Sequence, residues 1–265
     1  MTDHAEAAPP PLLIERQGAI ATLCFNRPAA LNAIDVPMAQ AFLAAVQAIA
    51  QDPGVRVVVL RGAGKGFMAG GDLATLRANP VQGAMDLLTP LHAGLALLAQ
   101  IDAPVIAQVH GVAAGAGLSM LLQADYVLMA EGTRLNLAYI NLGTSCDVGA
   151  SWSLPRLVGM RQALEIALLG DAFTAEDALR LGLVNRILPA ADLDAATAAM
   201  AERLAAGPTV AYGAMKRLMR QSMERSLSEQ LDAEQQAFAR CAATSDFREG
   251  IAAFHERRPA QFNGR

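Results

Sequence analysis

A lone aspartate, Asp147, lies in a stretch of otherwise uncharged residues, 143–149 (GTSCDVG). The nearby side chains of Leu142, Ala150 and Trp152 are apolar. A carboxyl group buried among such neighbours is poorly solvated, which raises its pKa and makes it a stronger base. The same residues also fit an exposed turn or a helix start capped by Asp147. Asp147 is therefore a candidate general base, and a structural role stays open.

Two glycine-rich segments, residues 62–66 (GAGKG) and 115–117 (GAG), each follow an apolar run. Neither fits a nucleotide site, because no GxGxxG leads directly into a helix and Lys65 is followed by Gly66 rather than Ser or Thr. Such segments do let backbone N–H groups approach a ligand closely. One donor from each would form an oxyanion hole, which stabilises negative charge developing on a carbonyl oxygen. Tight turns and close packing are the structural alternative.

Two other chemistries are disfavoured by the distribution of serines and cysteines. Ser119 and Ser151 have no histidine in a recognisable triad relation, which argues against a serine hydrolase. The cysteines, Cys24, Cys146 and Cys241, are odd in number and widely spaced. They form neither a disulfide framework nor a metal-binding pattern, so we expect a reducing compartment and no metal.

The composition is that of a globular protein with a large core: 53% of the 265 residues are hydrophobic and 17% are charged. The formal net charge of −4 gives no electrostatic footprint for a nucleic acid or an anionic membrane. The N-terminal segment, MTDHAEAAPPP, has no Lys or Arg, and no uncharged apolar run is long enough to cross a membrane. We therefore expect a cytoplasmic protein.

The elements that position these candidates follow a pattern of strand, glycine loop and helix that occurs twice. Because the carboxyl ends of parallel strands meet at one edge of a sheet, both glycine segments are expected to lie close together. The pattern predicts a hairpin of residues 12–14 and 19–25, strands over 55–60, 105–109 and 126–130, and helices over 37–50 and from 115 to about 123.

Beyond Leu154 the sequence is helical almost throughout. Glycines mark the ends of the predicted helices, 160–169, 174–181, 190–205 and 210–240. We therefore expect a disordered lead over residues 1–11, an α/β core over 12–200, and a helical region over 201–265 that packs on the core or on a neighbouring subunit.

Six short motifs, in the right order, resemble the enoyl-CoA hydratase/isomerase (crotonase) family. Each motif is weak by itself, but together they extend from about residue 12 to Phe262. The final segment, from Gln230 onward, most resembles the phenylacetate-pathway branch, whose members isomerise ring-epoxide and unsaturated acyl-CoA thioesters. The motifs are NRPAALNA (26–33), GKGFMAGGDL (64–73), PVIA (104–107) with GVAAGAG (111–117), LPRLVG (154–159), GLVN (182–185) and the closing SDFREG (245–250) with RPAQF (258–262).

The resemblance implies a crotonase-like spiral of ββα turns, an α-helical C-terminal trimerisation region and an acyl-CoA thioester substrate. It places the oxyanion hole at the backbone N–H groups of Gly71 and Ala116. It also implies a homotrimer or a hexamer made of two trimers, with no cofactor other than the coenzyme A of the substrate. The implied CoA-binding residues are Ala29, Ala30, Leu31, Ala69, Asp72, Leu73 and Ala74.

One of these positions departs from the family, which usually has Lys or Arg beside the CoA phosphates where this chain has Ala29. The phosphate contacts must then come from elsewhere, and the candidates are Arg27, Lys65 and a neighbouring subunit's Arg258. For Asp72 we expect a bracing role in its loop rather than chemistry.

A second departure concerns the catalytic residues. Hydratases that this chain resembles use two glutamates, and their positions are occupied here by Ser119 and Tyr139, neither of which is a carboxylate base. The resemblance instead aligns Asp147 with the catalytic aspartate of phenylacetate-pathway and dienoyl-CoA isomerases. One carboxylate can move a proton between two carbons while an oxyanion hole holds the dienolate. The resemblance therefore predicts an isomerase.

Two alternatives stay open. Asp147 also aligns with the nucleophilic aspartate of 4-chlorobenzoyl-CoA dehalogenase, and His92 and Tyr139 occupy the places of its assisting His and Trp. Aryl substitution by Asp147 with help from His92 is thus a second hypothesis, although the sequence favours a partly exposed helical histidine without any role. The third hypothesis is a catalytically inactive paralogue that binds acyl-CoA.

Overall fold

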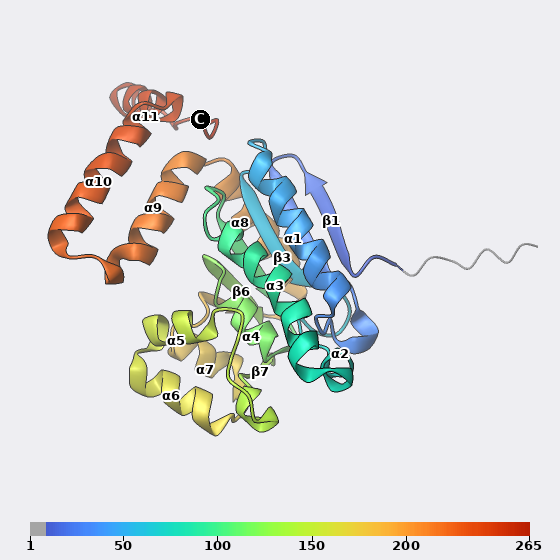
Figure 1. The fold of residues 1–265 in the computed structure, drawn as a ribbon. Coiled ribbons are helices and arrows are strands. Elements are labelled where there is room, and N and C mark those ends of the chain that lie inside the picture. The colour runs from blue at the N-terminus through green and yellow to red at the C-terminus, as the bar shows by residue number, and fades with distance from the viewer. Residues whose placement is uncertain (1–8) are drawn as a thin grey trace, which may run out of the picture.

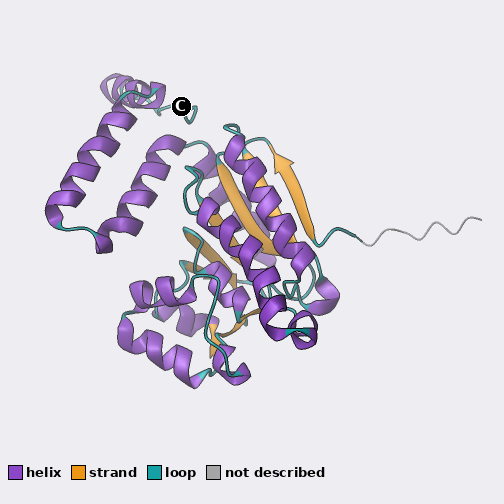
Figure 2. Ribbon diagram, in the orientation of Figure 1, coloured by secondary structure: helices purple, strands orange, loops and turns teal. Residues whose placement is uncertain are grey.

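The computed structural model describes residues 9–265, so most of the predicted disordered lead lies outside the described residues. A six-stranded sheet forms the centre of the fold, in the order β1-β2-β3-β4-β6-β9 (Figures 1 and 2). The predicted hairpin is confirmed, since β1 and β2 pair antiparallel, and the remaining neighbours pair parallel. The strands are β1 (Leu12–Gln17), β2 (Ile20–Phe25), β3 (Val57–Gly62), β4 (Val105–Val109), β6 (Tyr126–Ala130) and β9 (Arg186–Leu188).

Helices cover both faces of this sheet, and the alternation of side chains along β3 shows how. Val58 and Leu60 pack into the larger core with helix α1 (Val36–Gln51), against which α3 (Pro80–Leu98) packs. Val57 and Val59 point to the opposite face, which α8 (Leu193–Ala205) covers. Burying one such side chain stabilises the fold by about 1.5–3 kcal/mol, so a strand with two apolar faces must lie inside the protein.

A second, smaller sheet places the candidate site. Its strands are β5 (Val112–Ala114), β7 (Arg134–Asn136) and β8 (Phe173–Thr174). β5 and β7 are parallel and end together, and the Gly115 N–H donates to the Asn136 carbonyl at 2.9 Å. The helix after β5, α4 (Ala116–Leu121), and the 3-10 turn η2 (Tyr139–Leu142) after β7 therefore start side by side.

Most predicted elements of the core are confirmed, and the strands over 105–109 and 126–130 and the helix over 160–169 have the predicted bounds. Helix α3 was not predicted, because Pro90 and two glycines interrupt its pattern. The boundary predicted at residue 200, between the core and the C-terminal helical region, lies inside α8. This helix packs on the central sheet. The remaining helices of the core are α2 (Leu73–Ala78), α5 (Ala150–Val158), α6 (Met160–Leu169) and α7 (Ala175–Arg180).

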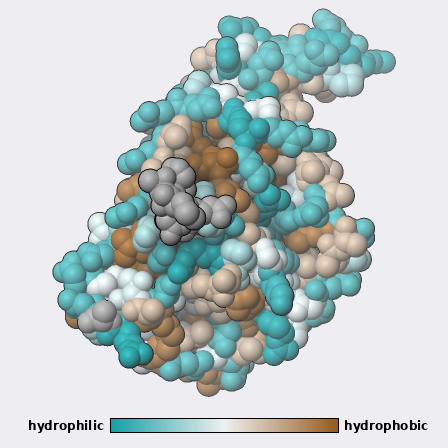
Figure 3. All heavy atoms as spheres, turned by 90° about the vertical axis from the view of Figure 1, so that its right-hand side faces the viewer, coloured by the Kyte–Doolittle hydropathy of each residue, from teal (hydrophilic) through white to brown (hydrophobic). Residues whose placement is uncertain are grey.

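The C-terminal helices extend away from this core, and the view of Figure 3 shows them as a projection beyond the compact body (Figures 1 and 3). The single helix predicted over 210–240 is wrong, because a capping box formed by Ser226 and Glu229 starts a new helix. Salt bridges from Lys216 and Arg220 to Asp125, at 2.7 and 2.8 Å, fix the first of these helices to the core. The region comprises α9 (Thr209–Gln221), η4 (Ser222–Glu224), α10 (Leu227–Ala242) and α11 (Ser245–Glu256).

Within residues 9–265, none of the helices combines the length and the hydropathy needed to span a bilayer. The same part of the chain holds no group of three or more His, Cys, Asp and Glu side chains that could ligate a metal ion.

Candidate active site

The chain that continues the first glycine-rich segment, residues 67–71, meets the second segment backbone to backbone, and residues 65 and 66 themselves lie against Gly111 and Val112. Gly70 has a φ of +110°, and a Cβ on this residue would lie 3.3 Å from the Ala114 carbonyl oxygen. A Cβ on Gly117 would lie 2.1 Å from the Met68 carbonyl oxygen, which leaves no room for any side chain. The contact continues as a hydrogen bond from the Ala114 N–H to the Met68 carbonyl at 2.9 Å. Glycine is therefore required at position 117 by the close approach of the loops and favoured at position 70 by its positive φ.

The N–H of Gly71 and the N–H of Ala116, both at this contact, have no acceptor within residues 9–265. Ala116 begins α4, where a backbone N–H has no intrahelical partner. The residues on either side of Gly71 make the hydrogen bonds to Ile34. The Ile34 N–H donates to the Gly70 carbonyl, and the Asp72 N–H donates to the Ile34 carbonyl, so the Gly71 N–H takes part in neither bond. Such unpaired donors from two adjoining loops are what an oxyanion hole requires.

Asn32 holds this loop arrangement together, a role that sequence reasoning missed. Its fully buried side chain donates to the carbonyls of Ala63 and Gly66 at 2.8 Å and accepts the Arg27 N–H at 2.9 Å. Its φ is +58°, in the left-handed region that asparagine tolerates better than most residues. The asparagine within the LNA motif was the signal that could have pointed to this role.

The second part of the site is a chain of hydroxyl groups that ends on Asp147. Tyr139 donates a hydrogen bond to Asp147 Oδ1, and the hydroxyl of Ser119 lies 3.0 Å from that of Tyr139. Ser119 Oγ also lies 3.2 Å from the Gly115 carbonyl oxygen, at the glycine contact. The structure thus brings together three predicted site residues from α4, η2 and the loop before α5.

Electrostatics favour a neutral phenol beside the carboxyl group. Burial, and next the charge of Asp147, raise the pKa of Tyr139 far above its usual value, so Tyr139 keeps its proton. Burial also raises the pKa of Asp147, and the hydrogen bond from Tyr139 acts in the opposite direction. The predicted alternative of Asp147 as a helix cap is not observed, because Gly149 caps α5 and the Asp147 side chain bonds Tyr139.

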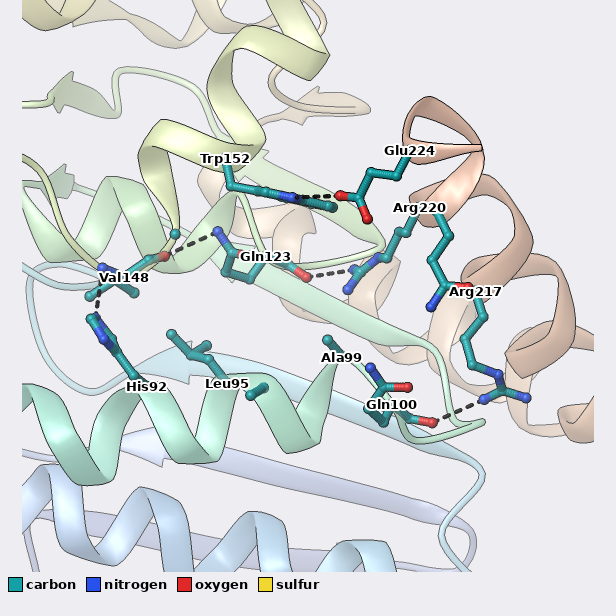
Figure 4. A pocket seen from close by; sticks show the side chains of 13 residues that line it. His92, Leu95, Ala99, Gln100, Gln123, Val148, Trp152, Arg217, Arg220 and Glu224 are labelled. Carbon is teal, nitrogen blue, oxygen red and sulfur yellow. Dashed lines mark hydrogen bonds between the residues drawn. The ribbon is translucent and has the colours of Figure 1, made fainter. Parts of the chain in front are cut away.

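His92, on α3, lies beside this loop without touching the Asp147 carboxylate. Its Nε2 accepts the backbone N–H of Val148 at 3.2 Å. A second side chain that sequence reasoning missed, Gln123, donates from Nε2 to the Val148 carbonyl at 3.1 Å (Figure 4). Both contacts lie in the wall of a cavity of about 490 Å³ between α3, α5 and the α9 region. Gly71, Ala116 and Asp147 do not line that cavity.

The two predicted CoA-binding segments lie next to each other. The Ala69 N–H donates to the Leu31 carbonyl at 3.0 Å, and Ala29, Ala30, Leu73 and Ala74 are exposed beside them. Asp72 braces its loop, as expected: it caps α2 through the Ala74 N–H, and its hydrogen bond with Arg27 lowers its pKa.

Arg27 is engaged inside the protein, since its guanidinium contacts Asp35, Asp72 and the Ala33 carbonyl. Arg258 pairs with Glu249 and Glu256, both at 2.6 Å. Of the three candidates for the CoA phosphates, Lys65 is exposed and carries no salt bridge within the described residues.

A mostly parallel sheet joined to a smaller one, with unpaired amides where the glycine loops meet, is the arrangement of crotonase-fold proteins. The fold is shared with the crystal structure of an enoyl-CoA hydratase from Polaromonas sp. JS666, with a TM-score of 0.90 and 33% identity over 95% of this chain and 99% of that one. The profile of the Enoyl-CoA hydratase/isomerase family matches residues 15–265. The chain belongs to this family.

Relatives within the family differ in the reaction that their names state. A 1,2-epoxyphenylacetyl-CoA isomerase of Escherichia coli K12 is 34% identical, over 93% of this chain and 95% of its own length. A 2,3-dehydroadipyl-CoA hydratase of the same organism is also 34% identical, over 96% and 99%. Overall similarity therefore establishes an enzyme of this family, and the choice between isomerase and hydratase depends on the site.

Proposed function

We propose that the protein is an acyl-CoA isomerase in which Asp147 is the single acid/base. The observation that carries this proposal is the hydrogen-bond chain from Ser119 through Tyr139 to Asp147. The two positions where similar hydratases have glutamates supply hydroxyl groups that bond one carboxylate. Hydration needs one group to activate water and a second to deliver a proton, whereas an allylic proton shift needs one base that returns the same proton.

In the proposed reaction, the thioester oxygen is bound by the N–H groups of Gly71 and Ala116. Asp147 removes a proton from the carbon next to the thioester carbonyl or from its vinylogue. The negative charge moves onto the oxygen, where the two amide donors stabilise the dienolate. Asp147 then returns the proton two carbons away, so the double bond shifts and no atom is gained or lost. A ring-epoxide acyl-CoA is a second substrate type for an enolate held in this way.

This chemistry requires no cofactor beyond the coenzyme A of the substrate. The edge formed by residues 29–31 and 69–74, where residues 29–31, 73 and 74 are exposed, is the surface that we assign to CoA, with Lys65 nearby.

A homotrimer or a dimer of trimers is part of the proposal. The projecting helices expose large apolar side chains, with Phe254, Leu227 and Phe238 at 82%, 76% and 65% exposure. Apolar surface of this extent on a projecting region favours contact with another subunit.

The alternative with a specific observation behind it is aryl substitution with Asp147 as nucleophile, because His92 lies beside the Asp147 loop. In that reaction His92 would activate water, yet its Nε2 is already bonded to the Val148 N–H. An inactive acyl-CoA-binding paralogue is the remaining alternative.

The test is turnover by the wild type and Asp147→Asn on 3-enoyl-, 2-enoyl-, epoxyphenylacetyl- and 4-chlorobenzoyl-CoA. We expect isomerisation by the wild type and a loss of about 10²–10⁴-fold in the variant, with CoA-thioester binding retained. Asp171→Asn, at an exposed position after α6, is the matched control. Hydration that persists in Asp147→Asn refutes the assignment, and an acid-stable adduct on Asp147 establishes aryl substitution.

A further inference from the structure

The backbone directly after Asp147 is strained. Val148 has a φ of +54°, a region that β-branched residues rarely enter, and its side chain is fully buried. Gly149 follows with a φ of +75°, so two successive residues are left-handed. A strained conformation of this kind persists only where surrounding contacts impose it, and such residues cluster at functional sites.

Both backbone polar groups of Val148 are held by side chains from other elements (Figure 4). The N–H belongs to the peptide bond between Asp147 and Val148, and it donates to His92 Nε2 at 3.2 Å. The carbonyl accepts from Gln123, whose amide also bonds Ser153 Oγ at 3.0 Å. Two successive peptide planes are therefore fixed: His92 on α3 holds the one between Asp147 and Val148, and Gln123, just after α4, holds the one between Val148 and Gly149.

The direction of the first hydrogen bond defines the state of the histidine. A backbone N–H can only donate, so His92 Nε2 must accept and carries no proton. The ring is then neutral with its proton on Nδ1, and the Nε2 lone pair is occupied. A histidine acting as a general base through Nε2 would need that lone pair free.

We propose that His92 is a positioning residue, which accepts the Val148 N–H and so holds the left-handed peptide that aims the Asp147 carboxylate. This role rests on the proposed function, in which Asp147 is the acid/base. Tyr139 fixes the carboxylate itself, and His92 fixes the backbone that carries it. His92 takes no part in proton transfer.

The first test observes the histidine directly. The chain has four histidines, and ¹⁵N-histidine labelling with long-range ¹H–¹⁵N correlation spectra reports the tautomer of each ring. His92→Gln assigns the His92 signal by its loss. We expect an Nδ1–H tautomer for His92 in the wild-type protein, and an Nε2–H tautomer or a doubly protonated ring overturns the proposal.

The second test separates positioning from chemistry by kinetics. His92→Phe removes the acceptor, and we expect kcat to fall by about 100-fold with KM little changed, since a small misplacement of a catalytic group costs this much. His92→Gln keeps a neutral acceptor and should retain most of kcat. An amide cannot transfer a proton as histidine does, so equal loss in both variants refutes the positioning role.

The strain at Val148 supplies a matched pair of suppressor variants. Glycine adopts a φ of +54° without cost, whereas alanine does not. In the His92→Phe background, Val148→Gly should therefore restore much of kcat and Val148→Ala should not. Failure of Val148→Gly to restore more than Val148→Ala overturns the proposal. Full turnover by Asp147→Asn overturns both the proposed function and this role, whereas an Nε2–H tautomer overturns this role alone.

Discussion

The hydroxyl groups of Ser119 and Tyr139 lie 3.0 Å apart, although 20 residues separate them in the chain. Tyr139 uses its hydroxyl hydrogen in the hydrogen bond to Asp147, so its oxygen can accept a hydrogen bond from Ser119. Ser119 is completely buried, and its single hydroxyl hydrogen lies within reach of both the Tyr139 oxygen and the Gly115 carbonyl, which links the chain to the glycine loop. Two residues that cannot act as carboxylate bases thereby control the environment of the carboxylate that can.

The pH dependence of turnover tests this chain. The hydrogen bond from Tyr139 lowers the pKa of Asp147 against the opposing effect of burial. Tyr139→Phe should therefore raise the pKa of Asp147 further, and the acid limb of kcat/KM should move to higher pH because the base is protonated over a wider range.

Ser119→Ala should move the acid limb of kcat/KM in the same direction by a smaller amount, because it removes a hydroxyl group that contacts Tyr139 and not Asp147 itself. The measurement is kcat/KM against pH for the three proteins. An acid limb that stays in place, or that moves to lower pH in Tyr139→Phe, is incompatible with the assigned chain.

Asp147→Asn should be more stable than the wild type at neutral pH. Because burial raises the pKa of Asp147, folding favours its protonated form. The stabilisation that comes from protonating Asp147 is fully present below the pKa of this carboxyl group in the unfolded chain. It is lost as the pH rises through the higher pKa of the same group in the folded protein. Asparagine cannot carry the charge, so we expect the free energy of unfolding to rise by about 1 kcal/mol, a common size for a stabilising replacement.

Urea unfolding of both proteins at pH 7 and at pH 3 measures this difference. The gain should be present at pH 7 and small at pH 3, where both side chains are neutral. A variant less stable than the wild type at pH 7 would show that the charged carboxylate stabilises the fold.

Ala116→Pro tests the amide donor of the second loop. Proline is tolerated at the first position of a helix, and the N–H that it removes has no acceptor within residues 9–265. The fold should survive while kcat falls by about 10²–10³-fold, the cost of losing one oxyanion donor. Ala116→Gly keeps the N–H and is the control. Circular dichroism reports whether the variant folds, and steady-state kinetics give its kcat. Undiminished turnover in Ala116→Pro would show that this amide plays no part in the mechanism.

The oligomer should depend on the apolar side chains of the projecting helices. Light scattering of the wild type should give the mass of three or six chains. The double variant Phe238→Glu with Phe254→Glu should shift the mass toward one chain, because charges do not tolerate burial in an apolar interface. Ile14→Glu, at an apolar position on β1 that is 59% exposed, should leave the mass unchanged. A monomeric wild type contradicts the proposed assembly.

Sequence reasoning was reliable where one local signal dominates. The strand over 105–109 is apolar at every position except Gln108, and the helix over 160–169 lies between two glycines, so both were predicted with their bounds. Helix α3 was missed because Pro90 breaks the local pattern, and its existence depends on packing against α1. The kink between α9 and α10 depends on the Ser226 capping box, which competes with an otherwise continuous helical pattern.

The sequence indicated which residues belong to the candidate site, but not which hydrogen bonds join them. The resemblance pointed to Ser119, Tyr139 and Asp147, and the structure brings them together. No local rule predicts that His92 bonds an amide 56 residues away, or that buried Val148 is left-handed. These features arise from tertiary packing, which imposes a backbone conformation that the residue type disfavours.

The unpaired amides of Gly71 and Ala116 belong to the main chain, and this has an evolutionary consequence. A codon change replaces a side chain, so among the twenty residues only proline deletes such a donor. The groups that we propose to bind the thioester oxygen are thus inherited almost independently of the side chains around them. Positions such as 119 and 139 are free to diverge, and a lineage can exchange one reaction for another while it keeps the same anion receptor.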